Sequence, residues 1–396
     1  MTEKWKEFGV HPVINACGTV TRLGGARMTP EVVAGWVTGT EHSVSMDQLQ
    51  AAACRWIVAA SGAEAGLIVS GASAGLLLGT AAILAGHDLS RMERLPDTTG
   101  MPNEILVART QRTGYDHAVR TAGAKLVEVG MDEMTSGSGV RMPEVWEYEA
   151  AITPQTVGVL YTLTDNALPT LADVMHMARI HSLPVLVDAA AQLPPIDNLK
   201  TILATGADLV VFSGGKAMRG PADTGILCGK RALIGSAFLQ MMDNDELFDL
   251  WTPPVEFVDK HRLKGLPRQG IGRVAKTSPS DIFALLTALD GFSTESLTHD
   301  IEMRRAWLKK IEASVSKLAY CRIHESDSGI IMTVEPRTSV DLIDLCTRLR
   351  EAAPPIFVGT AELRRGMITI NPACLVAEEV EPLAVRLRET LETVVT

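Results

Sequence analysis

Short, almost continuously apolar segments alternate with helical segments over about residues 60–235, and this alternation constrains the fold more than any other feature. A strand with one face in water alternates apolar and polar side chains, whereas a strand covered on both faces does not. The pattern therefore predicts an α/β fold with a mostly parallel sheet covered by helices on both faces. The expected strands, some running into loops, are 65–70, 105–110, 125–130, 156–163, 184–191, 207–216 and 225–229, and the expected helices are 46–60, 76–86, 142–153 and 170–183.

The length of the chain predicts more than one compact unit. The sequence has 396 residues, and one domain usually holds about 100–200. We expect an N-terminal segment (1–45), a large domain (46–275) and a C-terminal part (276–396). The C-terminal part should begin with a long helical region, 277–320, and continue as a small α+β domain. The stretch 250–275 shows no clear period, which predicts a surface or interface loop.

The composition is that of a globular protein, and it argues against several classes of partner. Hydrophobic residues make up 46% of the sequence, charged residues make up 21%, and the formal net charge is −10. An acidic chain has no overall attraction for nucleic acid or for an anionic membrane, and no apolar run is long enough to span a bilayer. The six cysteines contain no C-x-x-C pair, which predicts reduced thiols and a cytoplasmic protein. The histidines form no cluster with ligand spacing, so no metal site is expected.

A turn that contains only small residues, 70–75, lies between an expected strand and an expected helix. Small side chains let a ligand approach the backbone, and the free N–H groups at the start of a helix favour a phosphate. The turn matches neither the P-loop nor the G-x-G-x-x-G pattern, and a tight strand-to-helix connection without a ligand would have the same composition. The candidate phosphate-binding residues of this turn are Ser70, Gly71, Ala72 and Ser73.

Two charged residues follow later strands. Asp188 ends the segment PVLVD, and ligands of open α/β sheets bind beyond the carboxyl ends of strands. A carboxylate there could pair with a protonated pyridine nitrogen, or it could cap a following helix. Lys216 follows the next strand in a glycine-rich turn, where a desolvated lysine would have a lowered pKa and could form an imine. Ser213, three residues earlier, is placed to help bind a phosphate.

The order of these features is that of fold-type-I enzymes that use pyridoxal-5′-phosphate (PLP), with Asp188 and Lys216 separated by 28 residues. The sequence resembles the family that contains selenocysteine synthase (L-seryl-tRNA selenium transferase) and enzymes of the D-glucosaminate-6-phosphate ammonia-lyase type. The resemblance covers nearly the whole chain, and the lysine segment is its most specific part. The segments that carry it are INACGTVTRLGGARM (14–28), QRTGYDHAVRTAGA (111–124), PVLVDAAAQLPP (184–195), LVVFSGGKAMRGPADTGIL (209–227) and GIGRVAKTSPSDIFALLTAL (270–289).

The resemblance implies the PLP-dependent aminotransferase-like fold (type I), in which a large α/β domain is followed by a smaller C-terminal α+β domain. It implies that Lys216 forms the Schiff base with PLP and transfers protons, and that Asp188 binds the pyridine nitrogen. The residues that would line the phosphate site are Ser70, Gly71, Ala72, Ser73 and Ser213.

Further site residues follow from the same resemblance. His117 would lie on or beside the cofactor ring, with Tyr115 as the competing aromatic residue and a surface or core position as the alternative. Arg273, in a G-R-x-x-K segment, would lie near the phosphate or the neighbouring subunit. Arg22 and Arg365 are candidates for binding a carboxylate or phosphate of the substrate, because guanidinium groups match these anions. Ordinary exposed arginines are the alternative for all three.

The resemblance implies a lyase that catalyses α,β-elimination on a small hydroxy or sugar-derived amino acid and releases ammonia and a 2-oxo acid. An amino-acid racemase or an aldolase would share the cofactor and differ only in its product, so both stay open, as does a PLP-binding protein without catalysis. The acidic net charge and the position of INACGTV close to residue 1 argue against an aminoacyl-tRNA substrate. A homo-oligomer is implied, in which a neighbouring subunit completes each active site.

Overall fold

The structure is a computed structural model that describes residues 2–131, 142–326 and 329–394. It divides into two compact units, a larger one formed by Met28–Asp290 and a smaller one formed by Met1–Arg27 together with Gly291–Thr396. This division differs from the boundaries at residues 45 and 275 that the sequence predicts.

Long-range packing explains both differences. Strand β1 (Ile14–Ala16) pairs in parallel with β11 (Ile356–Val358), so residues 1–27 of the expected N-terminal segment join the smaller unit, whereas residues 28–45 belong to the larger one. Helix α11 (Pro279–Asp290) packs on α2 (Pro30–Thr38) and α3 (Met46–Ser61), so it belongs to the larger unit. Neither contact leaves a signal in the local hydrophobic period, because the partners lie far apart in the chain.

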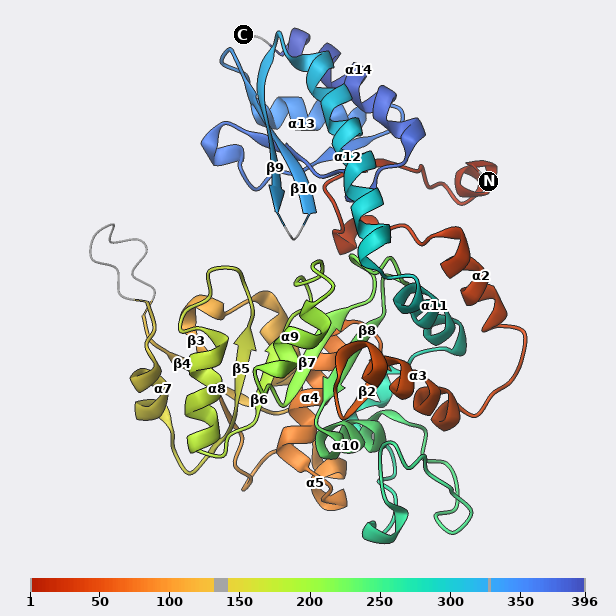
Figure 1. The fold of residues 1–396 in the computed structure, drawn as a ribbon, viewed down its shortest axis with the longest axis vertical. Helices are drawn as coiled ribbons and strands as arrows, with labels where there is room; N and C mark the ends of the chain where they lie inside the picture. The colour runs from red at the N-terminus through yellow and green to blue at the C-terminus, as the bar shows by residue number, and fades with distance from the viewer. Residues whose placement is uncertain (1, 132–141, 327–328, 395–396) are drawn as a thin grey trace. The chain divides into compact units, whose positions relative to one another are not determined.

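The described part of the larger unit contains the strands β2 (Ala65–Val69), β3 (Glu104–Ala108), β4 (Lys125–Val129), β5 (Thr156–Thr162), β6 (Val185–Asp188), β7 (Leu209–Ser213) and β8 (Gly225–Gly229). They form one seven-stranded sheet in the order β2-β8-β7-β6-β5-β3-β4 (Figure 1). Strand β8 runs antiparallel to β2 and β7, and the other neighbouring strands are parallel. The prediction of a mostly parallel sheet is therefore confirmed, and the carboxyl ends of β2, β7, β6, β5 and β3 lie at one edge.

Helices cover both faces of the sheet. On one face, α4 (Ala72–Ala85) packs across β5, β6, β7 and β8, and α10 (Arg231–Met241) packs on α4, β2 and β8. On the other face, Ile57 of α3 fills the space beside Gly66, where a Cβ atom would lie 2.5 Å from Ile57 Cγ2. The other helices of the larger unit are α5 (Leu89–Arg94), α6 (His117–Thr121), α7 (Val145–Ala151), α8 (Leu171–Ile180) and α9 (Asn198–Ala204).

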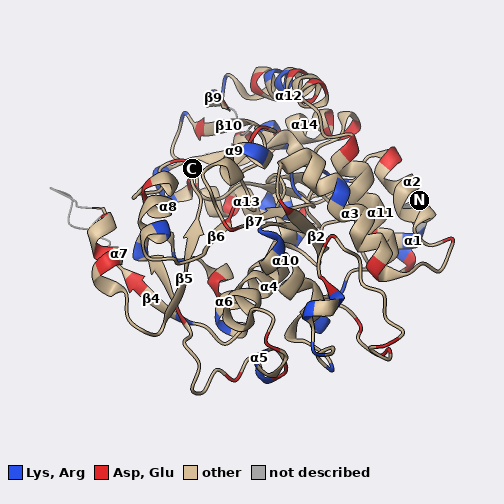
Figure 2. Cartoon of the chain, turned by 60° about the horizontal axis from the view of Figure 1, so that its bottom comes forward, with Lys and Arg blue, Asp and Glu red and all other residues tan. Residues whose placement is uncertain are grey.

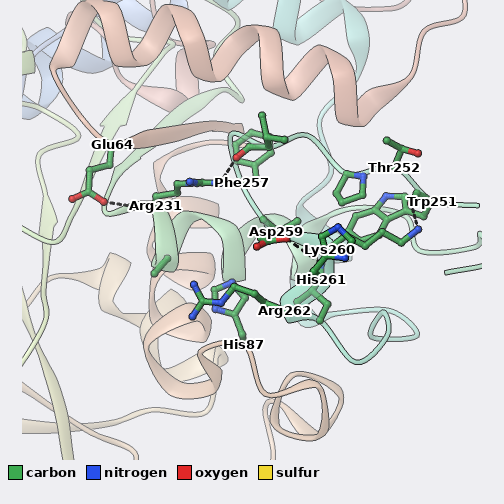
Figure 3. A pocket seen from close by; sticks show the side chains of 15 residues that line it. Glu64, His87, Arg231, Trp251, Thr252, Phe257, Asp259, Lys260, His261 and Arg262 are labelled. Carbon is green, nitrogen blue, oxygen red and sulfur yellow. Dashed lines mark hydrogen bonds between the residues drawn. The ribbon is translucent and has the colours of Figure 1, made fainter. Parts of the chain in front are cut away.

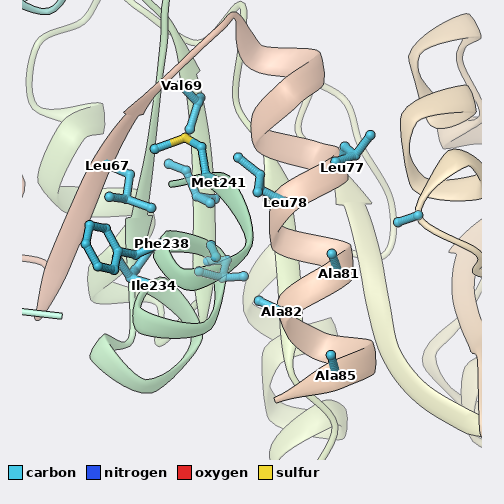
Figure 4. Packing of buried hydrophobic residues seen from close by; sticks show 14 of the residues in the cluster. Leu67, Val69, Leu77, Leu78, Ala81, Ala82, Ala85, Ile234, Phe238 and Met241 are labelled. Atoms are coloured by element: carbon cyan, nitrogen blue, oxygen red, sulfur yellow. The ribbon is translucent and has the colours of Figure 1, made fainter. Parts of the chain in front are cut away.

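The core between the sheet, α4 and α10 is apolar (Figure 4). Leu67 of β2 and Phe238 and Met241 of α10 are all buried in it. Helix α4 carries no charged residue, as expected for a helix that is covered on nearly all sides. A Cβ atom on its Gly75 would lie 2.9 Å from Val211 Cγ1, so the helix lies close against β7. This close packing places the first turn of α4 beside the carboxyl edge of the sheet.

The smaller unit has the α+β character that the sequence predicts, with an antiparallel sheet in the order β12-β10-β9. Its further elements include three helices that carry much of its apolar core. The bounds are α1 (Thr2–Glu7), α12 (Thr294–Val315), β9 (Ala319–Ser326), β10 (Gly329–Pro336), α13 (Leu342–Glu351), β12 (Ile368–Ile370) and α14 (Ala377–Thr393).

Two local predictions are corrected, and one further helix was not predicted. The strand expected at 184–191 ends at Asp188, and the helical region expected at 277–320 is two helices. The second of these, α12, is capped by Ser293, whose side chain accepts a hydrogen bond from the N–H of Ser296. Helix α10 is not predicted, because it is buried on nearly all sides and so lacks an apolar stripe with a helical period. No helix in the described part of the chain combines the length and apolarity needed to cross a bilayer.

Candidate active site

The edge formed by the carboxyl ends of the strands brings together the candidate residues of β6 and β7. Asp188 ends β6 and pairs in register with Val211 of the neighbouring strand β7, and Ser213 ends that strand. Side chains alternate along a strand, so Asp188 shares the face of Leu186, and Ser213 shares the face of Val211. Leu186 and Val211 both belong to the core that packs against α4. Asp188 and Ser213 therefore lie on the same face, beside the start of α4.

The small-residue turn is held against this edge by β8. Gly71 has φ +85°, a conformation that glycine adopts without strain, and it directly precedes α4. A Cβ atom on Gly225 would lie 2.7 Å from the carbonyl carbon of Gly71 and 2.8 Å from the nitrogen of Ala72. Gly225 is also the register partner of Ser213. The turn, β8 and Ser213 thus lie side by side.

The first turn of α4 offers unpaired backbone donors. The helix begins at Ala72 and runs for 14 residues. The N–H groups of Ala72, Ser73 and Ala74 have no acceptor within the helix, because an acceptor four residues earlier would lie outside it. Together with the positive end of the helix dipole, these donors favour a phosphate group.

Lys216 follows β7 in a loop that hydrogen bonds close at both ends. The N–H of Gly214 donates to Thr224 O over 2.9 Å, and the N–H of Gly220 donates to Gly214 O over 2.9 Å. A Cβ atom on Gly215 would lie 2.4 Å from the Cα atom of Ala222, so only glycine permits this approach. The backbone that carries Lys216 is consequently constrained before any ligand binds.

Burial dominates the electrostatics of Asp188 and Lys216. Desolvation raises the pKa of Asp188, although the N–H of Ala190, 3.1 Å from Oδ1, and the charge of Lys216 oppose this shift. Desolvation lowers the pKa of Lys216, and the charge of Asp188 opposes that shift in turn. The two groups are thus close enough to interact. The alternative role of Asp188 as a helix cap is wrong, because residues 189–192 form a turn rather than a helix.

These residues fit PLP by the chemistry of their donors. A carboxylate at Asp188 suits the ring nitrogen, a half-buried amine at Lys216 suits the carbonyl carbon, and the free amides of α4 suit the phosphate. The Ser70 and Ser213 hydroxyls are half-buried beside that turn, and Ser73 is exposed on α4. Among the described residues, no group of three or more His, Cys, Asp or Glu side chains is arranged to hold a metal ion.

The aromatic candidates lie at the start of α6. His117 is exposed, and its Nδ1 lies 3.2 Å from Nη2 of Arg120. Tyr115 has 63% of its surface exposed. Within the described ranges, no hydrogen bond or ion pair links either residue to Asp188 or Lys216. The ring-stacking role of His117, with Tyr115 as its competitor, therefore stays a prediction.

The arginine candidates are distributed over both units. Arg273 lies in the larger unit, where it forms an ion pair with Asp243 at 2.7 Å. Arg22 lies in the smaller unit, with its Nη2 3.6 Å from Cys17 Sγ. Arg365 also lies in the smaller unit and pairs with Glu362 at 3.0 Å. The phosphate-binding role of Arg273 and the substrate-binding roles of Arg22 and Arg365 stay predictions.

Gln111 is a residue at this edge that the sequence reasoning missed. It follows β3 and is buried, and its Oε1 accepts a hydrogen bond of 3.2 Å from the N–H of Thr162. Thr162 is the register partner of Asp188. The Nε2 atom of Gln111 has no hydrogen-bond partner in the described structure. Its place directly after an expected strand was the signal that could have identified it.

A cavity of about 870 Å³ lies at the opposite edge of the sheet, beside the segment 251–263 (Figure 3). Glu64, which precedes β2, and Arg231, which follows β8, both line it. Glu64 accepts a hydrogen bond of 3.0 Å from the backbone N–H of Arg231. Because Asp188 and Lys216 lie at the carboxyl ends of their strands, this cavity is separate from the candidate active site.

Comparisons with known proteins agree with this geometry. Residues 112–242 match the family model of aminotransferase class V. The chain is 26% identical over 404 residues to D-glucosaminate-6-phosphate ammonia lyase of Salmonella typhimurium, with 98% of each chain covered. It is 27% identical over 409 residues to 5′-C-glycyluridine monooxygenase-decarboxylase of a Streptomyces species, with 98% of this chain and 92% of that relative covered.

Similarity to a solved structure extends over the whole chain. A structure of D-glucosaminate-6-phosphate ammonia-lyase matches with a TM-score of 0.79 and 25% identity, covering 99% of this chain and 98% of that one. An L-seryl-tRNA(Sec) selenium transferase of Geotalea uraniireducens is 28% identical over 200 residues, which span 44% of this chain and 37% of that relative. The resemblance seen in the sequence and the fold-type-I PLP fold are therefore confirmed, and PLP is supported as the cofactor.

The lowered pKa of Lys216 predicts a pH-dependent stability for the cofactor-free protein. As pH rises from neutrality toward 10.5, the folded chain loses the Lys216 proton before the unfolded chain does. The unfolded state then binds more protons, so the wild type should gain stability relative to Lys216→Met, by at most about 1.4 kcal/mol per pH unit. Urea unfolding of both proteins across this range measures the difference.

A second variant controls for general effects of removing a lysine. Lys200 is exposed on α9, so the difference in stability between Lys200→Met and the wild type serves as the reference. A difference for Lys216→Met that varies with pH no more than this reference would contradict the half-buried, deprotonation-prone state of Lys216.

Proposed function

We propose that this chain is a PLP-dependent ammonia-lyase that catalyses α,β-elimination on a small hydroxy or sugar-derived amino acid. The observation that carries this proposal is the half-buried, interacting pair of Asp188 and Lys216 on the sheet face that also holds the phosphate turn. Full-length similarity to an ammonia lyase supports the choice of reaction.

Each group of the site has a role in this reaction. PLP, when bound, supplies an electron sink for the charge left at Cα after its proton is removed. The free amides of α4, with Ser70 and Ser213, would hold the phosphate, and Asp188 would hold the ring nitrogen in its protonated form. Because burial lowers the pKa of Lys216, its amine is more readily neutral than that of an exposed lysine and can accept the α-proton.

The same amine can complete the elimination. Once protonated, Lys216 can donate its proton to a hydroxyl leaving from Cβ, so that water departs and the α-proton is accounted for. The unsaturated amine that results hydrolyses to a 2-oxo acid and ammonia. The net change is loss of ammonia from the substrate, with no external oxidant or reductant. A racemase would use the same proton acceptor and return the proton to Cα, which makes racemisation the competing outcome.

A second candidate reaction follows from the Streptomyces relative. That protein is named a monooxygenase-decarboxylase, and it matches this chain over nearly its full length. An oxidative decarboxylation would consume oxygen and release carbon dioxide, whereas the proposed elimination does neither. The products therefore separate the two candidates.

The test is an assay of purified protein with PLP and either D-glucosaminate 6-phosphate or D-serine. The expected result is release of ammonia and a 2-oxo acid in equal amounts, without oxygen uptake. Asp188→Asn should lower the rate about 10- to 100-fold, because a charged hydrogen bond is lost. Asp197→Asn, at an exposed aspartate just before α9, is the matched control and should leave the rate unchanged. Oxygen-dependent release of carbon dioxide, or racemisation without ammonia, would contradict the lyase assignment.

The proposed partner is a small molecule. The net charge of −10 and the mixture of acidic and basic residues along α12 (Figure 2) both suit a chain without a nucleic-acid partner. All six cysteines are free thiols, which supports a cytoplasmic enzyme.

We also propose that the chain forms a homo-oligomer through the segment between α10 and α11. Four large apolar residues of this segment are more than two-thirds exposed, and such a concentration is typical of a protein interface. The arrangement would let a neighbouring subunit approach Arg273, which lies in the same segment. The four residues are Leu247 (71%), Leu250 (69%), Val255 (76%) and Val274 (85%).

Light scattering tests the oligomer. A dimer would have twice the chain mass of 42.5 kDa, and the double variant Leu247→Glu, Val274→Glu should shift it toward the monomer. Ile180→Glu, at another exposed apolar residue (63%) on α8, is the control and should leave the mass unchanged. A monomeric wild type would refute the oligomer while leaving the lyase assignment to be judged by its products.

A further inference from the structure

Arg219 has an unfavourable backbone conformation in the loop that carries Lys216. Its φ is +59°, and only Ser182, with φ +56°, shares this property among the non-glycine residues that the structure describes. L-amino acids other than glycine rarely adopt this region, because Cβ crowds the backbone. Glycine would adopt it without strain. Backbone strain of this kind is concentrated at active sites and ligand-binding loops, where it is part of how the site is prepared for its ligand.

Arg219 and Lys216 belong to one tight turn. The N–H of Arg219 donates to the C=O of Lys216 over 3.0 Å. A hydrogen bond between residues three apart closes a β-turn, which brings the two Cα atoms within about 7 Å. The hydrogen bond from Gly220 N–H to Gly214 O fixes the end of this turn. The surrounding loop thus holds the strained residue beside the reactive amine.

The charge of Arg219 acts on the start of α2. The pKa of Glu31, in the first turn of α2, is lowered by hydrogen bonds to its own backbone and to Thr29, and also by the charge of Arg219. Arg219 is the cationic side chain closest along the chain to Lys216, and it is half-buried.

We propose that Arg219 binds the α-carboxylate of the amino-acid substrate. This inference rests on the proposed function, in which the substrate amino group must reach the position of Lys216. The α-carboxylate is attached to the same carbon as that amino group, so a cation within one turn of Lys216 suits it. A phosphate at the far end of a sugar-derived chain would lie several bonds further away. A guanidinium also matches a carboxylate with two parallel hydrogen bonds.

The key variant is Arg219→Gly, because it removes the cation and supplies the residue that the backbone conformation favours. A purely structural role for Arg219 predicts a lower thermal midpoint. The carboxylate role predicts a midpoint for the cofactor-free protein that is unchanged or higher, and a PLP dissociation constant within about threefold of the wild type. The dissociation constant for serine, followed by the visible absorption of the bound cofactor, should rise about 10- to 100-fold.

Matched ligands and variants sharpen the test. Serinol replaces the carboxylate of serine with a hydroxymethyl group, so Arg219→Gly should bind serinol as the wild type does. Arg219→Lys keeps the charge but loses the planar guanidinium that binds a carboxylate through two hydrogen bonds, so its affinity for serine should be intermediate. Ser182→Gly relieves the other positive φ, at the end of α8, and should leave serine binding unchanged.

Three results would overturn the inference in different ways. Serine binding by Arg219→Gly with wild-type affinity would show that the carboxylate is bound elsewhere. A parallel loss of PLP and serine affinity would place Arg219 on the cofactor phosphate. If neither enantiomer of serine nor D-glucosaminate 6-phosphate changes the wild-type spectrum, the proposed function itself fails, and the role of Arg219 fails with it.

Discussion

The partial burial of two interacting charges, Asp188 and Lys216, is the constraint on which the rest of the structure depends. Their pKa values shift in opposite directions, each toward the neutral form, because desolvation outweighs their mutual attraction. A pair of this kind is unfavourable for folding and must be held by its surroundings. Three features fix Asp188 and Lys216 in place: the adjacent parallel strands β6 and β7, helix α4 packed closely on the sheet, and a glycine-rich loop closed by hydrogen bonds.

Unfavourable features are concentrated in one loop. Lys216 loses hydration there, and Arg219 has a backbone conformation that most residues avoid. Natural proteins accept such local costs where they prepare a site for a ligand, and they recover the stability elsewhere. Here the compensating stability comes from an apolar core that runs between the sheet, α4 and α10. The site is thus preorganised by a scaffold that is stabilised by a conventional apolar core.

Much of this arrangement could be predicted from the sequence, because its signals are local. Continuous apolar runs identify the strands, so Asp188, the last residue of β6, and Lys216, in the loop after β7, fall at the carboxyl edge in any such sheet. The features that escaped prediction depend on distant contacts. The pairing of β1 with β11 places residues 1–27 in the smaller unit, and the positive φ of Arg219 has no signature in composition. The position of His117 relative to the cofactor ring likewise cannot be predicted from the local sequence around it.

The central claim is that Lys216 is the residue to which PLP is covalently attached. The most direct test is to load the purified protein with PLP, reduce it with borohydride, digest it, and locate the cofactor by mass spectrometry. The account predicts one modified peptide, which contains Lys216, and no incorporation when the chain carries Lys216→Ala. Attachment to another lysine, such as Lys230 beyond β8, or failure to incorporate PLP at all, would contradict it.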